Sequence, residues 1–332
     1  MPVFCLSDKT DTSNPILMLL MIDYFTKMNK MVDKILRKIN NNLRIYREDL
    51  QTKGLYYSIL HRLFKIPKLK EILTPLVNYL KPDFIKINNY KLYIDKFDTT
   101  VSEKLVETKV WEDFESKIFK QSLKTGDIVV DIGAHIGYYT LIASKIVSRE
   151  GKVYAFEPDP KNFKLLKRNV EENQLHNVVL TNKAITSKTG QVKLYLNKEN
   201  TGDHRIYDTK DDRDEILVDS TSLDDYFKNI KRKIDVIKMD IQGAEYEAIM
   251  GGLGLLRKNP QIKIFCEFWP MGLKLNNTNP ENFLAVFRKF GFRIFHIDEE
   301  RKRLIPQSAD QLIKLYPPHN PDFTNLYILK AR

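Results

Sequence analysis

The chain has 332 residues, 42% of them hydrophobic and 29% charged, which excludes a wholly disordered or collagen-like protein. This length predicts about two domains, or one large domain with an extension. The two cysteines, Cys5 and Cys266, exclude a disulfide framework and a zinc-finger spacing, so we expect a reducing compartment and a cytoplasmic protein. The longest apolar run, Ile16–Ile22, is far shorter than the roughly 20 residues that cross a bilayer.

The net charge of +11 is concentrated near the N-terminus. Residues 25–70 hold twelve basic and three acidic side chains, a net charge of +9. Apolar residues from Phe25 to Leu43 recur every three or four positions, which predicts an amphipathic helix with a cationic face. This segment either packs on the rest of the protein or contacts an anionic membrane peripherally, at its inner face. It resembles no nucleic-acid-binding module, so we do not expect nucleic acid as a partner. The oligomeric state stays open.

The hydropathy pattern changes along the chain and predicts four parts. Alternating apolar residues from Phe84 to Ile94 predict a β-hairpin that turns at Asn88-Asn89. We therefore divide the chain into a flexible N-terminus (1–20), a basic helical extension (21–82), a β-hairpin lead-in (83–109) and a main domain (110–332).

After residue 125, short β-branched runs alternate with helical stretches. This order predicts an α/β Rossmann-like fold, a mostly parallel sheet with helices on both faces. Residues 193–218 interrupt the order and predict extra strands with a polar loop. The expected strands are 128–132, 153–156, 178–180, 234–239, 262–268, 292–297 and 326–329, and the expected helices are 136–147, 160–172 and 244–256.

The segment from Asp127 to Thr140 predicts a nucleotide-binding turn. A buried strand ends at Asp131, Gly133 permits a tight turn, and Gly137 lets the following helix pack closely on the strand. The next strand ends at Glu157, whose carboxylate can accept hydrogen bonds from both hydroxyls of a ribose.

His135 distinguishes between the cofactors that such a turn can bind. A dinucleotide loop has glycine at this position, because its backbone must approach a pyrophosphate closely. A bulky side chain favours a cofactor with one nucleoside and no pyrophosphate, such as S-adenosylmethionine. Two alternatives stay open, a nicotinamide-dependent oxidoreductase and a non-catalytic binding protein that retains the fold.

Three motifs in this order resemble the FkbM-type methyltransferases: Asp131–Thr140 (DIGAHIGYYT), Phe156–Pro158 (FEP) and Ile234–Glu245 (IDVIKMDIQGAE). The resemblance covers roughly residues 110–332. It implies the class I methyltransferase fold, a seven-stranded sheet whose last strand is antiparallel, with S-adenosylmethionine as cofactor. It also implies O-methylation of a hydroxyl on a sugar, a glycan or another polyhydroxylated small molecule. Gln242 occupies a position where many members carry Glu, so a mechanism that needs a carboxylate there is not expected.

Acidic residues near strand ends are the main candidates for catalysis, since ligands of open α/β sheets bind there. Asp240 is the first candidate for a base that takes the acceptor's proton or positions its oxygen. Its alternative role is an N-cap of the next helix. Glu267, in an apolar strand, either pairs with Lys238 or contacts the substrate. His204, in a polar loop, is a further candidate base.

Other candidates follow from position. Asp240 and Glu267 have the hard oxygen atoms that Mg²⁺ prefers, but two acids define no metal site, so we assign no metal ligands and the presence of Mg²⁺ stays open. Glu245 either contacts substrate or interacts with a helix dipole. The predicted catalytic residues are Asp240, His204 and Glu267; the predicted cofactor-binding residues are Asp131, Gly133, Ala134, His135, Gly137, Tyr138, Glu157, Pro158, Asn182, Ala184 and Asp240; the predicted substrate-binding residues are Asp203, Arg205 and Glu245.

Overall fold

A computed structural model describes residue 78 and residues 81–87 and 89–330. The chain divides into two units, Met1–Leu63 and Phe64–Arg332, and every described residue belongs to the second. The predicted flexible N-terminus and the basic segment 25–70 lie outside the described residues. Within the described part of the chain, no helix is long and apolar enough to cross a membrane.

The largest sheet in the described part of the chain has eight strands. In chain order they are β3 (Ile128–Ile132), β4 (Lys152–Phe156), β5 (Val178–Thr181), β9 (Val236–Met239), β10 (Lys263–Phe268), β11 (Phe292–Asp298), β12 (Arg303–Pro306) and β13 (Thr324–Lys330).

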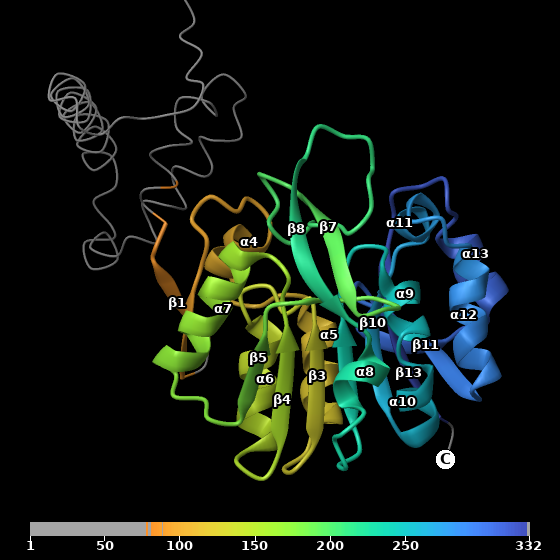
Figure 1. Ribbon diagram of the computed structural model, residues 1–332, viewed down its shortest axis with the longest axis horizontal. Coiled ribbons are helices and arrows are strands. Elements are labelled where there is room, and N and C mark those ends of the chain that lie inside the picture. The colour runs from red at the N-terminus through yellow and green to blue at the C-terminus, as the bar shows by residue number, and fades with distance from the viewer. Residues whose placement is uncertain (1–77, 79–80, 88, 331–332) are drawn as a thin grey trace, which may run out of the picture. The chain divides into compact units, whose positions relative to one another are not determined.

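The strands lie in the order β12-β11-β13-β10-β9-β3-β4-β5 (Figure 1). The five from β10 to β5 pair in parallel, and the last strand of the chain, β13, lies antiparallel between β10 and β11. The predicted class I methyltransferase arrangement is therefore confirmed. The predicted count of seven strands is one short, because β12 forms an edge hairpin with β11 that no strong apolar pattern marks.

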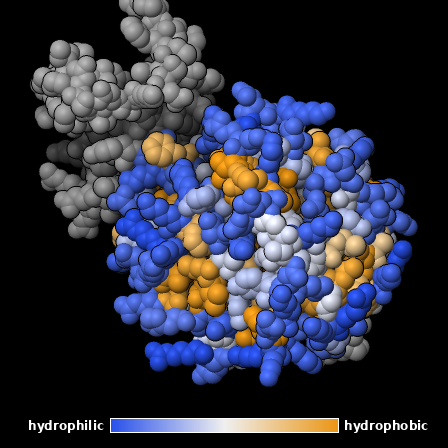
Figure 2. Space-filling model, in the orientation of Figure 1, coloured by the Kyte–Doolittle hydropathy of each residue, from blue (hydrophilic) through white to orange (hydrophobic). Residues whose placement is uncertain are grey.

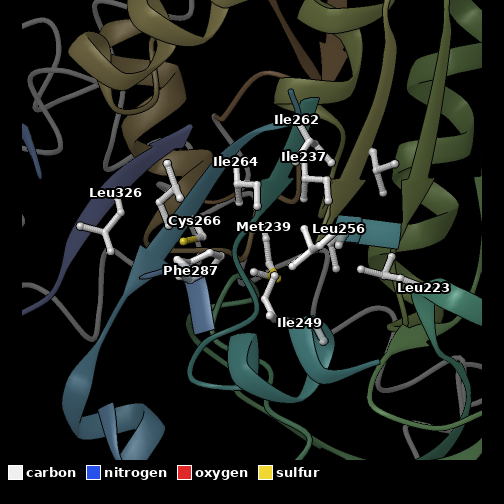
Figure 3. Packing of buried hydrophobic residues seen from close by; sticks show 14 of the residues in the cluster. Leu223, Ile237, Met239, Ile249, Leu256, Ile262, Ile264, Cys266, Phe287 and Leu326 are labelled. Atoms are coloured by element: carbon white, nitrogen blue, oxygen red, sulfur yellow. The ribbon is translucent and has the colours of Figure 1, made fainter. Parts of the chain in front are cut away.

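Alternation along the strands builds a hydrophobic core on each face of this sheet. Ile128, Val130 and Ile132 face one cluster, whereas Val129 faces the other. Figure 3 shows part of the first cluster, in which Ile237 and Ile264 of the sheet pack near helix residues. On the surface seen in Figure 2, hydrophobic side chains form separate patches between hydrophilic ones.

The helices divide between the two clusters. The first cluster includes residues of α8 (Leu223–Phe227), α9 (Glu245–Met250), α10 (Leu253–Lys258), α11 (Pro270–Leu275), α12 (Pro280–Lys289) and α13 (Ala309–Leu315). The second includes residues of α4 (Val101–Thr108), α5 (Asp113–Ser122), α6 (Tyr138–Val147) and α7 (Pro160–Glu172).

The helices of the structure differ from the expected ones in two ways. The expected helix 244–256 is two helices, α9 and α10, because it breaks at Gly251-Gly252. A Cβ on Gly251 would lie 2.3 Å from the carbonyl oxygen of Thr186, so close packing requires the glycine. Six further helices of the described residues, α4, α5, α8, α11, α12 and α13, were not among the expected helices.

Two smaller sheets complete the fold. The predicted hairpin is present as β1 (Phe84–Ile87) and β2 (Tyr90–Tyr93). The predicted extra strands form a three-stranded sheet of β6 (Ala184–Ile185), β7 (Gly190–Leu196) and β8 (Asp214–Thr221). The β7–β8 pair rises beyond the carboxyl ends of β3, β4 and β5 (Figure 1), and the intervening loop supplies residues to the site described next.

Candidate functional site

Two adjoining pockets lie along the carboxyl ends of the parallel strands. One contains Glu157 and is called the Glu157 pocket. The other contains Glu112 and is called the Glu112 pocket. Both are lined by a shared set of residues, Gly133, His135, Gly202, Asp240 and Gln242. A ligand that spans this shared wall would therefore contact both pockets.

The turn from β3 into α6 depends on two glycines. Gly133 has φ +78°, and Gly137 has φ +97°. A Cβ on Gly137 would lie 2.7 Å from Cδ1 of Leu166 in α7, so the glycine permits the close helix packing that the sequence predicted. His135 also has a positive φ, +51°, and its Nε2 lies 2.9 Å from Oγ1 of Thr201. The imidazole thus joins the turn to the loop after β7.

The Glu157 carboxylate joins the ends of β3 and β4. It accepts hydrogen bonds from the backbone N–H of His135 at 2.8 Å and of Asp159 at 2.9 Å. Burial raises the pKa of Glu157 to about 8, although both N–H donors oppose the shift. Each carboxylate oxygen has two lone pairs, so Glu157 can still accept ribose hydroxyls.

The neighbours of Glu157 only partly match the predicted set. Pro158 and Ala184 line the Glu157 pocket. Asn182 does not line it, but donates to the backbone carbonyls of Glu157 and Pro158 at 2.7 and 3.0 Å and so positions their turn. Lys183 and Ile185 line the pocket and were missed, because a single sequence does not show which residue of a loop faces inward.

Asp131 lies in the wall of the Glu112 pocket, together with Ala134 and Tyr138. Its Oδ2 accepts a 2.5 Å hydrogen bond from the Thr140 hydroxyl in the first turn of α6. Burial raises the pKa of Asp131 to about 6, despite this hydrogen bond. The end of β3 therefore contributes a carboxyl group whose charge depends on its surroundings.

Asp240 lies where the two pockets meet. Helix α9 begins at Glu245 with Ala244 as its N-cap residue and no side-chain cap, so the alternative N-cap role of Asp240 is wrong. Instead Oδ1 of Asp240 accepts a hydrogen bond from Nε2 of Gln242 at 2.9 Å. Burial raises the pKa of Asp240, and the Lys238 cation opposes the rise.

Gln242 bridges two of the candidate acids. Its Nε2 also lies 3.1 Å from both carboxylate oxygens of Glu267. A carboxylate at position 242 would place a third negative charge between Asp240 and Glu267, whereas the amide donates to both. This contact explains physically why glutamine suits the position in this chain.

The predicted pairing of Glu267 with Lys238 is wrong. The buried Lys238 ammonium lies 3.1 Å from Oε1 of Glu115, 4.0 Å from Oε2 of Glu112 and 4.8 Å from the centre of the Tyr139 ring. Burial alone would lower the pKa of Lys238, but Glu115 and Glu112 raise it above its usual value. Glu115 lies in α5 and Glu112 directly precedes that helix. Neither glutamate was among the predicted site residues.

His204 lies in the Glu157 pocket and does not line the Glu112 pocket. Its Nδ1 accepts the backbone N–H of Asn197 at 3.0 Å, and its Nε2 lies 3.7 Å from Oδ2 of Asp159. In a neutral ring the proton therefore resides on Nε2, facing Asp159, and neither nitrogen has a free lone pair. This geometry does not favour His204 as a base.

The three predicted substrate-binding residues line neither pocket. Asp203 forms ion pairs with Arg205 at 2.7 Å and Arg213 at 2.8 Å, and the Arg205 guanidinium lies 4.6 Å from the centre of the Trp269 ring. Glu245 is fully buried and accepts the backbone N–H groups of Ile241 and Gly243, each at 3.0 Å. Their partners show that they hold loops together.

The residues present fit S-adenosylmethionine. Glu157 can hold the ribose, and Gly133, which lines the same pocket, lets the turn lie directly against the backbone of Asp240. Asp131 and Asp240 continue the site with carboxyl groups that suit a cationic sulfonium and ammonium. Among the described residues, no group of three or more His, Cys, Asp and Glu side chains is arranged to hold a metal ion.

Two methyltransferase family models match parts of this chain. The family model of the methyltransferase FkbM domain matches residues 131–294, and that of protein-L-isoaspartate(D-aspartate) O-methyltransferase matches residues 74–184. Curated relatives include the probable cobalt-precorrin-6B C(15)-methyltransferases (decarboxylating) of Sulfurisphaera tokodaii and Saccharolobus solfataricus. They are 41% and 40% identical over 61 and 62 residues, 18% of this chain in each case. The matches span only 32% and 31% of the length of those relatives.

Similar solved structures are more distant in sequence. Methyltransferase FkbM from Methylobacillus flagellatus is 17% identical, with a TM-score of 0.38, over 62% of this chain and 44% of that one. A SAM-dependent methyltransferase from Aquifex aeolicus is also 17% identical, with a TM-score of 0.38, over 69% of this chain and 96% of that one. The segment matched by the FkbM model begins at Asp131, includes Glu157 and Asp240 and ends in β11. By this match the chain contains a domain of the FkbM-type family of S-adenosylmethionine-dependent methyltransferases.

Proposed function

We propose that this protein methylates a hydroxyl oxygen of a sugar, a glycan or another polyhydroxylated small molecule. The observation that carries the proposal is the position of Asp240 in the wall that the two pockets share. A carboxylate there is within reach of both a bound cofactor and an acceptor.

The Glu157 pocket suits the adenosine of the cofactor, because its carboxylate is held rigidly by two backbone N–H groups. S-adenosylmethionine, when bound, supplies an electrophilic methyl group on a sulfonium. The chain must then orient the acceptor oxygen in line with that methyl group and accept the hydroxyl proton. The Glu112 pocket leaves room for an acceptor next to Asp240.

Asp240 acts as the base in this proposal. Burial raises its pKa, which makes the carboxylate a better proton acceptor, while the Lys238 cation favours its ionised form. Gln242 fixes one Asp240 oxygen by a 2.9 Å hydrogen bond and leaves the other for the acceptor. Glu267, held by the same amide, then orients a second acceptor hydroxyl.

No observation favours the alternatives. For an oxidoreductase, the imidazole of His135 occupies the turn that a nicotinamide dinucleotide needs open, and Thr201 holds it there. For a non-catalytic protein, four buried or partly buried carboxyl groups in one pocket would be a cost without a role.

The first test is calorimetric titration of S-adenosylmethionine and of NADH into the full chain and into Glu157→Ala. We expect S-adenosylmethionine binding that weakens at least about tenfold in the variant, since the hydrogen bonds of Glu157 to ribose are lost. Binding of NADH alone would overturn the proposal.

The second test follows a labelled methyl group into a pool of glycans and polyhydroxylated metabolites. We expect a methyl ether, which survives mild base, whereas a methyl ester would release methanol. An N-methyl or C-methyl product would be distinguished from the ether by the NMR shift of its methyl group. Asp240→Asn should lower turnover by about 10²- to 10⁴-fold, the usual contribution of a positioned base. Label on carboxyl, nitrogen or carbon would contradict O-methylation of a hydroxyl.

A further inference from the structure

The two pockets differ in which parts of the chain build them. Every residue of the Glu157 pocket lies within the segment 131–294 that the FkbM model matches. The Glu112 pocket instead takes five lining residues from outside that segment: Thr100, Val101, Trp111, Glu112 and Phe323. The Glu157 pocket suits the cofactor, so we look for selection of the acceptor in the Glu112 pocket.

The Glu112 pocket holds more acidic than basic groups. Glu112, Asp131, Asp240 and Glu267 line it, against a single lysine, Lys238. Lys238 is already paired at 3.1 Å with Glu115, which is fully buried and does not line the pocket. The cofactor would bring a net charge of only about +1, from one carboxylate, one ammonium and one sulfonium. Burial raises the pKa of Glu112 to about 8, so a bound cation would favour its ionised form, whereas an anionic acceptor would disfavour it.

Aromatic rings surround the same opening. Trp111 and Phe323 line the Glu112 pocket together with Tyr138 and Tyr139. Phe323 is 56% exposed, so its ring is accessible to a ligand at the pocket opening. Ring faces attract ammonium groups within about 6 Å and also pack against apolar faces of sugar rings. The aromatic side chains and the carboxyl groups therefore both favour a ligand with a positive charge.

Glu112 is fixed in place by contacts from distant parts of the chain. One carboxylate oxygen accepts the Tyr139 hydroxyl at 3.1 Å, and the other accepts Nδ2 of Asn325, in β13, at 2.5 Å. Its backbone has φ +45°, a conformation that costs energy for a residue other than glycine. A strained, doubly held carboxyl group beside the pocket opening is preorganised for a ligand.

We infer that the Glu112 pocket selects an acceptor that carries a positive charge, an amine-bearing polyhydroxylated molecule of the amino-sugar class, with Glu112 as its counter-ion and the Trp111 and Phe323 rings against it. The proposal rests on the proposed function for the reaction that follows binding. Its test measures binding alone.

Three tetrasaccharides with the same kind of ring separate the ligand charges: fully deacetylated chitotetraose (amine), cellotetraose (hydroxyl) and tetragalacturonate (carboxylate). Each is titrated into the full chain saturated with S-adenosylhomocysteine, in 150 mM salt. At this ionic strength the Debye length is about 8 Å, so long-range attraction between charges is screened. The chain has two tryptophans, Trp111 and Trp269, so tryptophan fluorescence reports on this pocket, and Trp111→Phe identifies the signal.

We expect the amine to bind about tenfold more tightly than the neutral sugar, and the carboxylate not to bind. Glu112→Gln should remove the preference for the amine and leave cellotetraose binding unchanged. Glu300→Gln, an exposed glutamate that lines neither pocket, should change nothing. The net charge of +11 would favour the anionic probe non-specifically, so it cannot produce the expected order.

The inference is overturned if the carboxylate binds as well as the amine, if no probe binds, or if Glu112→Gln keeps the amine preference. If the Glu112→Gln variant fails to fold, the relative affinities of the wild-type chain for the three tetrasaccharides still test the inference. Amine-selective binding without methyl transfer would count against the proposed function alone. Methyl transfer to neutral or anionic acceptors without amine preference would count against this inference alone.

Discussion

A Cβ atom on Gly133 would lie 2.0 Å from the backbone carbonyl oxygen of Asp240. The ends of β3 and β9 meet here, and the backbone N–H of Asp240 donates to the carbonyl of Ile132 at 3.0 Å. Gly133 and Asp240 both line the two pockets. The absence of a side chain at position 133 thus determines how closely the cofactor turn approaches the candidate base.

Gly133→Ala should weaken S-adenosylmethionine binding at least about tenfold and lower the free energy of unfolding by about 1–3 kcal/mol, because the two strand ends must separate. Calorimetric titration and urea unfolding measure the two effects. Gly190→Ala is the matched control, since no atom lies within 4 Å of its Cβ position. Equal behaviour of the two variants would show that the close approach has no importance for binding.

The buried carboxyl groups should make the cofactor-free protein less stable as pH rises. Burial raises the pKa of Glu112 and Glu157 to about 8, and of Glu245 to about 7. Between pH 4.5, the ordinary value for Glu, and pH 8, the folded state binds protons that the unfolded state has released. The stability that this proton binding provides is therefore complete below pH 4.5 and is lost as pH rises through 8.

Urea unfolding at pH 6.0, 7.0 and 8.5 checks this expectation. Glu157→Gln should show a smaller decrease from pH 6.0 to 8.5 than wild type, because its amide does not titrate. Glu171→Gln, which removes an exposed carboxylate 3.8 Å from Lys167, should keep the wild-type slope. A wild-type free energy of unfolding that increases over this range would contradict the direction of these pKa shifts.

Replacement of His204 should distinguish it from Asp240. His204→Ala removes a ring whose nitrogens both face protein partners, so we expect turnover within about threefold of wild type and somewhat weaker cofactor binding. The pH–rate profile should keep the same basic limb. A loss of turnover as large as that of Asp240→Asn, with cofactor affinity intact, would instead identify His204 as the base.

The Lys238–Glu115 pair should show strong coupling. Lys238→Met or Glu115→Leu alone leaves a buried charge without its 3.1 Å partner and should cost about 3–5 kcal/mol of unfolding free energy. The double variant should cost much less than the sum of the two, because no unpaired charge remains between them. A double-mutant cycle by urea unfolding measures the coupling, and additive losses would show that the pair is not an energetic unit.

Local signals made parts of the fold predictable. The helix Pro160–Glu172 was expected with its observed bounds, because Asp159 caps it by accepting the N–H of Asn162 and Pro160 occupies its first turn. The strand Ile128–Ile132 was also expected as observed, since both of its faces are buried. By contrast, the first-turn N–H groups of Phe114 and Glu115 in α5 are bound by Glu299, far away in the sequence, so no local cap signal marks that helix.

The sequence by itself determined the Gly133 turn and the position of Glu157 in the candidate site, because both are placed by neighbouring elements, β3, α6 and β4. Only the tertiary structure decided which charges meet. Lys238 pairs with Glu115 across more than a hundred residues, and Asn325 reaches Glu112 from the last strand. Sheet order and burial control these pairings, since a charge that is removed from water needs a partner. The partners lie far apart in the sequence, so no periodic pattern predicts which residues will pair.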